Sequence, residues 1–361
     1  MTDFRLDTAT RRPQAEREAI LADPGFGSNF SDHMVLIDWT PERGWHDHRI
    51  VGYAPFALDP ASAVLHYAQE AFEGLKAYAH EDGSIWRFRA DVNATRFQRS
   101  ARRLALPELS VDDFLTGIDR LVDVDQDWVP RGAEQSLYLR PFMFARSPFL
   151  AVKPSTSVTY AVIASPSGAY FGGSGVQPVR IWVSRDFSRA APGGTGFAKC
   201  GGNYAASMVA QQEAEAAGCS QVAFLDAVEH RYIEELGGMN LFAVTANGHV
   251  ITPELTDSIL EGVTRSAVLR LAADAGLAVE ERRLSQQELF CGIDDGSIRE
   301  VFACGTAAII TPVASFTTDP DGTHVVAEGQ PGRTTLDLRR QLTEIQYGRR
   351  PDPYGWMHRI V

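Results

Sequence analysis

The first half of the chain alternates short apolar runs with amphipathic segments. Residues 72–80 (FEGLKAYAH) and 85–89 (IWRFR) are short and apolar-rich, which is typical of strands. The Asp82-Gly83 pair between these two runs predicts a β-hairpin. In residues 91–106 the apolar side chains recur at roughly helical spacing, which predicts a helix. Residues 1–25 are polar and mixed in charge, so we expect them to be loosely held.

The same pattern continues to the C-terminal half. Further strands are predicted at 33–39, 136–145, 156–165, 179–184 and 221–226, and a strand, tight turn and strand at 299–313. Further helices are predicted at 111–124, at about 203–217, where Gly218 ends the helix, and within 256–276. This mixture of strands and helices predicts an α/β fold.

A run rich in glycine, serine and proline, SPSGAYFGGSGVQP, occupies residues 165–178 and is the best candidate for a linker. The length of 361 residues suits two domains. We therefore expect a smaller N-terminal α/β domain at 1–165, an interdomain loop at 166–178 and a larger C-terminal domain at 179–361.

Composition and charge narrow the class of protein. Hydrophobic residues make up 44% of the chain and charged residues 22%, which is ordinary for a globular protein. The net charge of −12 argues against nucleic-acid binding, which needs a basic surface. The four cysteines form no CxxC motif, and the chain shows neither a signal peptide nor a long apolar stretch. We expect a cytoplasmic protein that binds no membrane.

One lysine, Lys199, stands in a glycine-rich loop, GGTGFAKCGGNYAAS, directly before a predicted helix. A phosphate-binding loop of the Walker A type is disfavoured, because such a loop needs Ser or Thr after its Gly-Lys pair and here Lys199 stands between Ala198 and Cys200. A lysine that forms an imine is a second possibility, since small and aromatic neighbours can favour its neutral amine. An ordinary surface lysine is the third.

The rest of the chain contains groups that pyridoxal phosphate would need. This cofactor requires a lysine for its aldehyde, a carboxylate for its ring nitrogen, and N–H groups at a helix start with a cation for its phosphate. Glu234 and Glu235 precede a Gly-Gly turn, and residues 262–264 begin a predicted helix. Arg96 and Arg99 lie in another predicted helix, at 91–106. Each has an ordinary alternative as a solvated or structural residue, but their joint presence favours a cofactor site.

Six longer motifs carry a family resemblance. They are EAFEGLKAY (70–78), YLRPF (138–142), AKCGGNYAAS (198–207), EELGGMNLF (234–242), ILEGVTRSAVL (259–269) and ACGTAAIITPV (303–313). The chain resembles the branched-chain amino acid aminotransferases from about Phe26 to about Gln346. The resemblance implies a two-domain, fold-type IV enzyme like D-amino acid aminotransferase. It also implies transfer of an amino group between L-leucine, L-isoleucine or L-valine and 2-oxoglutarate, by a ping-pong mechanism that depends on pyridoxal 5′-phosphate.

The resemblance also implies a set of cofactor contacts. Lys199 is expected to bind the cofactor covalently and to serve as the catalytic acid and base. Glu235 is expected to contact the ring nitrogen, with Glu234 as the second choice. The phosphate is expected to contact Arg96, Val263, Thr264 and Thr306, and the phenolic oxygen Tyr204.

The implied substrate pocket is apolar and aromatic. Its expected walls are Phe72, Tyr67, Tyr138, Tyr170 and Phe26. The Thr306-Ala307 turn is expected to hold the α-carboxylate through backbone N–H groups, and Arg140 and Tyr170 to receive the second carboxylate of glutamate. The family forms homodimers, in which Leu150 and Val152 would reach the neighbouring pocket. No metal is expected, because His46 and His48 lack a third ligand.

Two departures from the family and several alternatives remain. Some members carry a CxxC redox switch where this chain has Ala308 and Thr311, so we expect that switch to be absent. Gly238 replaces a threonine found in some relatives and leaves more room near the substrate. The alternatives are a D-amino acid aminotransferase, an aminodeoxychorismate lyase, a binding protein on a decayed enzyme fold, and a nucleotide-binding protein.

Overall fold

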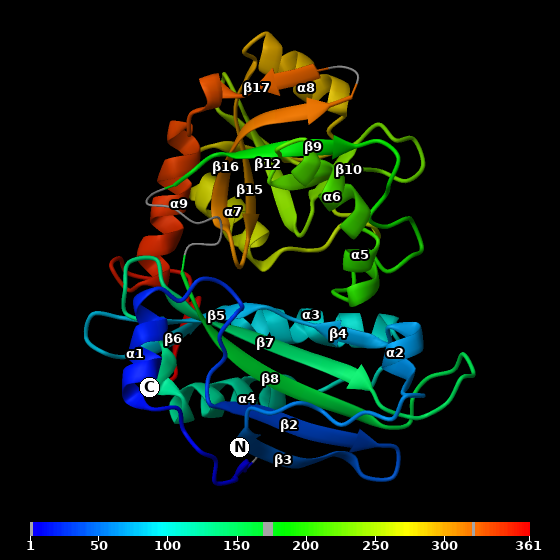
Figure 1. Cartoon of the computed structure of the whole chain (residues 1–361). Helices are drawn as coiled ribbons and strands as arrows, with labels where there is room; N and C mark the ends of the chain where they lie inside the picture. The colour runs from blue at the N-terminus through cyan, green and yellow to red at the C-terminus, as the bar shows by residue number, and fades with distance from the viewer. Residues whose placement is uncertain (1–2, 169–175, 320–321) are drawn as a thin grey trace. The chain divides into compact units, whose positions relative to one another are not determined.

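The structure is a computed structural model that describes residues 3–168, 176–319 and 322–361 (Figure 1). Its chain divides into two compact units. The first unit contains Met1–Gly172, Ala198–Gly201 and Ile345–Val361, and the second contains Gly173–Phe197 and Gly202–Glu344. The predicted domain boundaries assign the two short segments of the first unit to the second domain. Part of the predicted interdomain loop, residues 169–175, lies outside the described residues.

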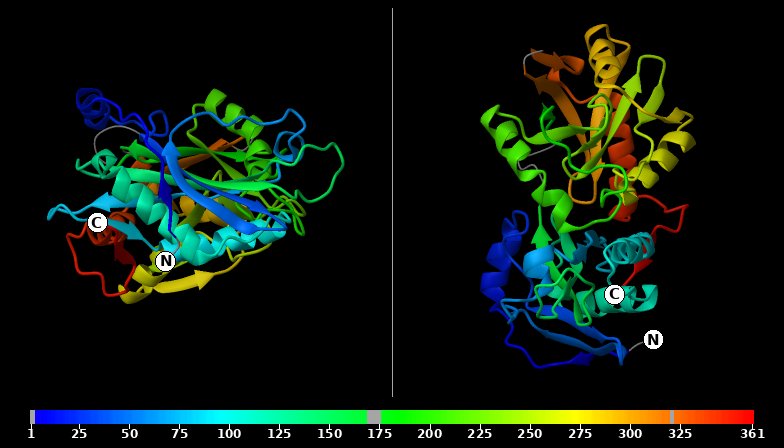
Figure 2. Two further views of the ribbon diagram at one scale, coloured as in Figure 1. Left: turned by 90° about the horizontal axis from the view of Figure 1, so that it is seen from below. Right: turned by 90° about the vertical axis from the view of Figure 1, so that its right-hand side faces the viewer.

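A nine-stranded sheet organises the first unit. In spatial order its strands are β1 (Arg5–Leu6), β3 (Gly44–Gly52), β2 (His33–Thr40), β8 (Val158–Ser167), β7 (Ser136–Ala145), β5 (Leu75–Ala79), β6 (Ile85–Phe88) and β18 (Met357–Arg359), and β4 (Glu70–Phe72) pairs with β7. The pair β2 and β3, in blue, lies side by side at one end of the sheet (Figures 1 and 2). The pairing of β18 with β6 explains why the C-terminal segment groups with this unit.

Two amphipathic helices supply much of the core of the first unit. Its helical segments are α1 (Gln14–Ala22), α2 (Ala63–Tyr67), α3 (Ala90–Arg103), α4 (Val111–Val124) and the 3-10 turn η1 (Gln126–Trp128). The predicted helices at 91–106 and 111–124 are thus confirmed as α3 and α4. Their buried rings, Phe97 and Phe114, both contact Tyr160 of β8, with ring centroids 5.7 and 6.1 Å away. This aromatic contact fixes both helices against the sheet.

Two local expectations differ from the structure. The predicted strand at 72–80 is divided into β4 and β5, because Glu73 and Gly74 leave the ladder and the Glu73 side chain is fully buried. Among the described residues 3–25, part of the segment is ordered against the fold: Phe4 is only 3% exposed, and α1 forms after Pro13. The predicted hairpin at Asp82-Gly83 is confirmed, with β5 and β6 antiparallel and Gly83 at φ +87°.

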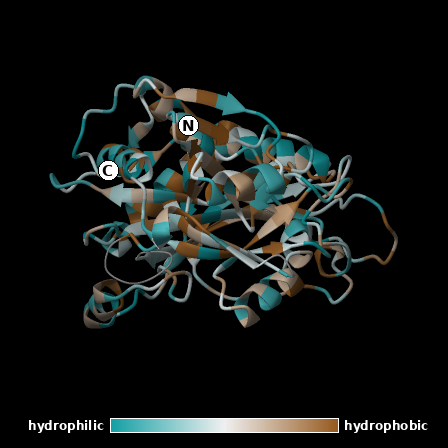
Figure 3. Cartoon of the chain, turned by 90° about the horizontal axis from the view of Figure 1, so that it is seen from above, coloured by the Kyte–Doolittle hydropathy of each residue, from teal (hydrophilic) through white to brown (hydrophobic). Residues whose placement is uncertain are grey.

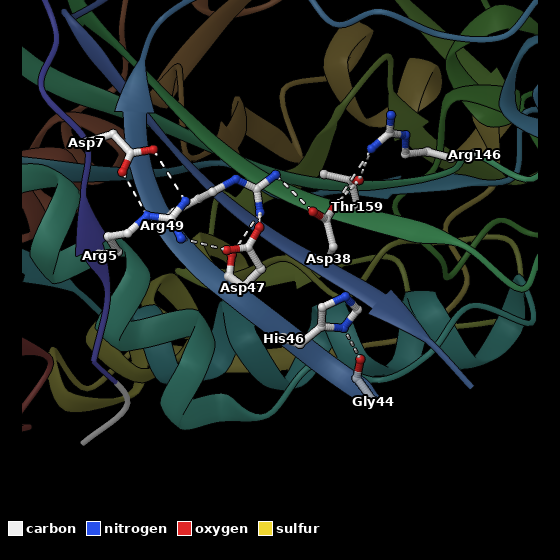
Figure 4. A network of polar contacts seen from close by, with 9 residues as sticks. All are labelled: Arg5, Asp7, Asp38, Gly44, His46, Asp47, Arg49, Arg146 and Thr159. Atoms are coloured by element: carbon white, nitrogen blue, oxygen red, sulfur yellow. Dashed lines mark hydrogen bonds and ion pairs between the residues drawn. The ribbon is translucent and has the colours of Figure 1, made fainter. Parts of the chain in front are cut away.

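Ion pairs link the outer strands of the first sheet (Figure 4). Arg49 of β3 contacts Asp38 of β2 at 2.9 Å and Asp47 at 2.8 Å. Arg5 of β1 reaches Asp47 at 3.1 Å, and Thr159 of β8 donates to Asp38 at 2.6 Å. Partly exposed pairs of this kind each contribute little free energy, and the Arg5–Asp47 pair links β1 to β3.

A second nine-stranded sheet organises the second unit. In spatial order its strands are β11 (Ile233–Leu236), β10 (Gln221–Leu225), β9 (Val179–Ser184), β16 (Ile309–Thr318), β15 (Ile298–Gly305), β12 (Met239–Thr245), β13 (His249–Thr252) and β14 (Ala278–Glu281), and β17 (Gly322–Val325) pairs with β16. Because β11 also pairs with β12, the strands from β11 to β12 close into a ring. The turn between β15 and β16 and the β11 carboxylates therefore belong to one closed ring of strands.

Helices surround this second sheet. They are α5 (Gly201–Ala205), α6 (Met208–Ala216), α7 (Val263–Asp274), α8 (Gln286–Asp294), the 3-10 turn η2 (Ala327–Gly329) and α9 (Arg333–Gln346). The single helix predicted at 203–217 is two helices, α5 and α6, separated by residues 206 and 207, where the Ser207 hydroxyl donates to the carbonyl of Asn203 at 2.9 Å. Figure 3 shows that helices of the chain contain both hydrophilic and hydrophobic residues, as expected of helices that pack with one face against the protein.

Candidate active site

The backbone around Lys199 is held by three hydrogen bonds within the first unit. The N–H of Lys199 donates to the Ser100 hydroxyl of α3 at 2.9 Å, and its carbonyl accepts from the N–H of Phe72 at 3.0 Å. The N–H of Gly201 donates to a carboxylate oxygen of Glu70. The lysine is therefore anchored to β4 and α3, although the chain before residue 198 and after residue 201 belongs to the second unit.

The Lys199 side chain is half-buried and lies over an aromatic ring. Its Nζ is 4.9 Å from the centre of the Phe72 ring. The Arg140 guanidinium lies over the same ring, also at 4.9 Å. A ring face attracts cations, so Phe72 places two basic groups around one apolar surface. This arrangement suits a lysine that acts on a bound molecule better than it suits a solvated surface lysine.

Arg96 forms a buried ion pair with Glu73. Its Nε and Nη2 contact the two carboxylate oxygens at 2.7 and 2.8 Å, and Asn93 donates to the same carboxylate at 2.7 Å. Burial raises the pKa of Glu73, but the charge and hydrogen bonds of Arg96 outweigh it, so the pKa lies below its usual value. Glu73 therefore stays ionised and fixes the Arg96 guanidinium on the inner face of α3. Arg99, on the same helix, is half-buried.

Three aromatic residues and Arg140 come together in the first unit. Tyr138 meets Phe26 edge to face at 5.2 Å between ring centres. Arg140 donates from Nη2 to the Tyr138 hydroxyl at 3.3 Å and lies over both the Tyr138 and the Phe72 rings. A side chain at Gly74 would overlap the Tyr138 hydroxyl, so the glycine makes room for this tyrosine. The cluster offers an apolar surface with one cation.

The remaining substrate candidates of the first unit lie around α2. Tyr67 is 37% exposed, and its hydroxyl donates to the carbonyl of Leu150. Leu150 and Val152 are 70% and 88% exposed in the loop after β7. Exposure of two apolar side chains to water is unfavourable, and burial at an interface between subunits would remove this cost. Tyr170 lies outside the described residues.

In the second unit both acidic candidates are buried on β11. Glu235 is 1% exposed, and its carboxylate accepts from the N–H of Leu260 and from Arg189 Nη2 at 3.1 Å. Glu234 accepts a hydrogen bond from the Ser258 hydroxyl. Burial raises the pKa of Glu234, with Ser258 and Arg189 acting in the opposite direction. The ion pair with Arg189 makes Glu235 the better anionic partner for a ring N–H.

Arg189 is a residue that the sequence analysis did not identify. It is 7% exposed and donates to the carbonyls of Gly196 and Ser258 at 3.1 and 2.6 Å as well as to Glu235. A single arginine in a loop belongs to no sequence motif that would predict its role. Its contact with β11 is seen only in the folded chain. Arg189 thus forms a buried ion pair with Glu235.

The start of α7 suits an anion. Gly262 is the N-cap of α7. A side chain there would overlap the amide oxygen of Asn240. The amide nitrogen of Asn240 in turn donates to the Leu260 carbonyl at 3.0 Å. Val263 and Thr264 form the first turn, are each 5% exposed and bring no negative charge. A helix start with these features attracts phosphate through its N–H groups and dipole.

The other second-unit candidates lie in two further places. Thr306 and Ala307 are half-buried in the turn between β15 and β16. Tyr204 is on α5, and its ring and hydroxyl lie 3.5 and 3.6 Å from where a side chain at Gly238 would begin. A side chain at this position would thus begin in ordinary van der Waals contact with Tyr204.

The two histidines considered as metal ligands have other contacts. His46 Nδ1 is 2.9 Å from the carbonyl oxygen of Gly44 (Figure 4), and His48 Nε2 is 3.4 Å from Asp113. Within residues 3–168, 176–319 and 322–361, we find no group of three or more His, Cys, Asp or Glu that could hold a metal ion. Among the same residues, no helix has the length and apolar character needed to cross a membrane.

The first unit holds a lysine beside an aromatic ring, and the second unit holds buried acids and a helix start that suits an anion. These are the groups that a pyridoxal-phosphate enzyme needs. The chain belongs to the amino-transferase class IV family, whose model matches residues 70–316. It is 54% identical over 350 residues to the branched-chain-amino-acid aminotransferase of Mycolicibacterium smegmatis, covering 96% of this chain and 95% of that protein. It is 56% identical over 348 residues to the probable branched-chain-amino-acid aminotransferase of Streptomyces coelicolor, with the same coverage.

Solved structures agree with the fold. The branched-chain amino acid aminotransferase of Escherichia coli has a TM-score of 0.75 and 29% identity, covering 90% of this chain and 99% of that one. The branched-chain amino acid aminotransferase of Thermobaculum terrenum in its PLP form has a TM-score of 0.74 and 26% identity, covering 91% of this chain and 98% of that one. The expected fold-type IV architecture is therefore confirmed.

Proposed function

We propose that this chain is a pyridoxal-phosphate-dependent transaminase. It moves the amino group between L-leucine, L-isoleucine or L-valine and 2-oxoglutarate in two half-reactions. The observation that carries the proposal is the anchored Lys199 beside Phe72, in a chain 54–56% identical to branched-chain enzymes over 96% of its length. The substrates are thus small molecules.

The described residues fit the cofactor. Lys199 supplies an amine, and Glu235 a buried anion, while the start of α7 supplies N–H groups without a negative charge. When bound, pyridoxal phosphate supplies an electron sink that stabilises negative charge at the substrate Cα. We assign the phosphate to Arg96, Val263, Thr264 and Thr306, and the phenolic oxygen to Tyr204.

The chain's own residues then perform three tasks. Lys199 would hold the cofactor covalently through Nζ and would serve as the acid and base that moves the proton at the substrate Cα. Glu235, which pairs with Arg189 at 3.1 Å, would contact the ring nitrogen of the cofactor. Glu73 and Asn93 orient Arg96, so its guanidinium need not be ordered when the phosphate binds.

Substrate choice follows from the aromatic cluster. Phe72, Tyr138 and Phe26 offer apolar area to a branched side chain, at about 25 cal/mol for each Å² removed from water. Arg140 offers a cation to the side-chain carboxylate of glutamate. We assign Tyr67 and Tyr170 to the same pocket, and the Thr306-Ala307 turn to the α-carboxylate, as proposals from the family resemblance.

We also propose a cytoplasmic homodimer. The exposed side chains of Leu150 and Val152 support an interface, in which they would line the pocket of the partner subunit. All four cysteines are free thiols, which favours a reducing compartment. Gel filtration tests the assembly: activity that elutes at the mass of one chain would contradict it.

The test of the function uses purified holoenzyme and no amino acceptor. Addition of L-leucine should change the visible absorption, because the amino group stays on the cofactor in the first half-reaction. D-Alanine and aminodeoxychorismate are the matched alternatives and should leave the spectrum unchanged. Lys199→Ala should retain cofactor but show no turnover. A response to D-alanine or aminodeoxychorismate in place of L-leucine would overturn the proposed substrate.

A further inference from the structure

Asn240 is a buried amide to which the proposed function assigns no task. It lies on β12 directly opposite Glu235 of β11, in the antiparallel hairpin that turns at Gly237 and Gly238. Asn240 is 7% exposed and Glu235 is 1% exposed. Residues directly opposite each other in an antiparallel pair carry their side chains on the same face of the sheet. The amide of Asn240 therefore lies on the same face as the carboxylate of Glu235.

These two side chains hold the backbone of a single residue, Leu260. The N–H of Leu260 donates to the Glu235 carboxylate, and the Leu260 carbonyl accepts from Asn240 Nδ2 at 3.0 Å. A carbonyl oxygen can only accept, so this contact fixes which end of the Asn240 amide faces Leu260. Leu260 is itself only 8% exposed, so water is a poor substitute for either partner. The cross-strand pair thus holds both polar backbone groups of Leu260.

The hold on Leu260 extends to the start of α7. Leu260 stands two residues before Gly262, the N-cap, and Val263 begins the helix. The oxygen end of the same Asn240 amide lies close to Gly262. Because so short a stretch of chain joins Leu260 to the N-cap, the position of Leu260 limits where the first turn of α7 can lie.

Glu235 has a further support that does not involve Asn240. Its carboxylate accepts from Arg189 Nη2 at 3.1 Å, and Arg189 is held in turn by the carbonyls of Gly196 and Ser258. A variant without the Asn240 amide therefore keeps both Glu235 and its arginine partner. What such a variant loses is the donor to the Leu260 carbonyl, on the side of the chain that leads into α7.

We propose that Asn240 is a positioning residue that sets the start of α7 at a fixed place relative to Glu235. This inference rests on the proposed function, in which Glu235 contacts the ring nitrogen and Val263 and Thr264 contact the phosphate. Both groups belong to one small cofactor, so the two contacts must be spaced to match it. Asn240 acts through Leu260, and a spacing that is set in advance need not be ordered when the cofactor binds.

Pyridoxal, which lacks the phosphate, separates this role from a general loss of stability. The full chain is freed of cofactor, and pyridoxal phosphate and pyridoxal are titrated separately while the visible absorption is followed. Asn240→Ala should weaken binding of pyridoxal phosphate about five- to twentyfold, because the buried Leu260 carbonyl loses its donor and the phosphate contacts are no longer held in place. Binding of pyridoxal should change less than about twofold, because Glu235 keeps Arg189.

The matched control is Thr252→Val. Thr252 is fully buried, and its hydroxyl donates to the carbonyl of Leu241, the neighbour of Asn240 on β12, at 2.7 Å. This variant also removes one buried hydrogen bond from a side chain to a backbone carbonyl in the same sheet. It should lower the unfolding midpoint as Asn240→Ala does, but it should leave the ratio of the two dissociation constants unchanged.

Three results would overturn the role of Asn240 alone: an unchanged affinity of Asn240→Ala for pyridoxal phosphate, an equal loss of affinity for both compounds, or the same change of ratio in Thr252→Val. If Asn240→Ala does not fold, Asn240→Ser, whose hydroxyl is shorter than the amide, decides by the same criteria. Wild-type protein that binds neither compound would overturn the proposed function and this inference with it.

Discussion

The buried pair of Glu73 and Arg96 allows a quantitative test of the site's electrostatics. Both side chains are almost fully buried, at 0% and 5% exposure, and contact each other at 2.7 and 2.8 Å. Glu73→Gln keeps the shape and an acceptor for Asn93 but leaves the Arg96 cation without its counter-charge. The variant therefore changes charge with little change in packing.

The expected magnitude follows from burial. Removing one partner of a buried pair costs about 3–5 kcal/mol, and because the glutamine still accepts hydrogen bonds we expect about 3 kcal/mol. For a domain of the size of the first unit, each kcal/mol shifts the unfolding midpoint by about 2–4 °C. Glu73→Gln should therefore lower the midpoint by about 6–12 °C.

The chain offers a control with the same geometry and different burial. Arg102, also on α3, contacts Glu108 with Nε and Nη2, both at 2.8 Å, but these side chains are 67% and 39% exposed. Glu108→Gln should cost less than about 1 kcal/mol, or less than about 4 °C. The assay is thermal unfolding of wild-type and variant holoenzymes at one protein and cofactor concentration. Equal midpoint shifts for the two variants would refute the reasoning.

Three further outcomes are expected. Arg189→Met should weaken cofactor retention on dialysis roughly tenfold or more, because Glu235 loses its cation; unchanged retention would remove Arg189 from the site. Burial raises the pKa of Asp226, but four backbone N–H groups lower it below 3.8, so its stabilising effect is present at neutral pH and lost as the pH falls through the lowered pKa. The difference in midpoint between wild type and Asp226→Asn should thus be constant from about pH 8 to 5 and shrink only below about pH 4. A thiol reagent should label native protein at exposed Cys291 and spare buried Cys304, whose pKa is raised by burial, and Cys291→Ser should abolish the rapid labelling.

Local sequence patterns were sufficient to predict an element where its buried residues recur with helical or strand spacing. The helix at 91–106 and the hairpin at Asp82-Gly83 follow from apolar spacing and turn chemistry. The division of the strand at 72–80 does not, because it results from a buried charge at Glu73 that pairs with a helix residue distant in sequence. Periodicity contains no information about such a partner.

The candidate site shows the same limit. Motifs that resemble those of a known family identified Lys199 and Glu235 as candidates without any structure. The partners that hold these segments, Arg189 beside Glu235 and Glu70 beside Gly201, depend on contacts that only the folded chain makes. The position of Arg140 over the Phe72 ring, on which its assignment to the side-chain carboxylate of glutamate depends, likewise comes from the folded chain.

The central claim is that Lys199 holds the cofactor covalently. Reduction of the holoenzyme with borohydride, followed by proteolysis and mass spectrometry, tests it directly, because reduction converts that link into a stable bond. The account predicts one modified peptide that spans residues 193–207, with the added mass on Lys199. Modification of a different lysine, or a reduced protein without any modified peptide, would contradict it.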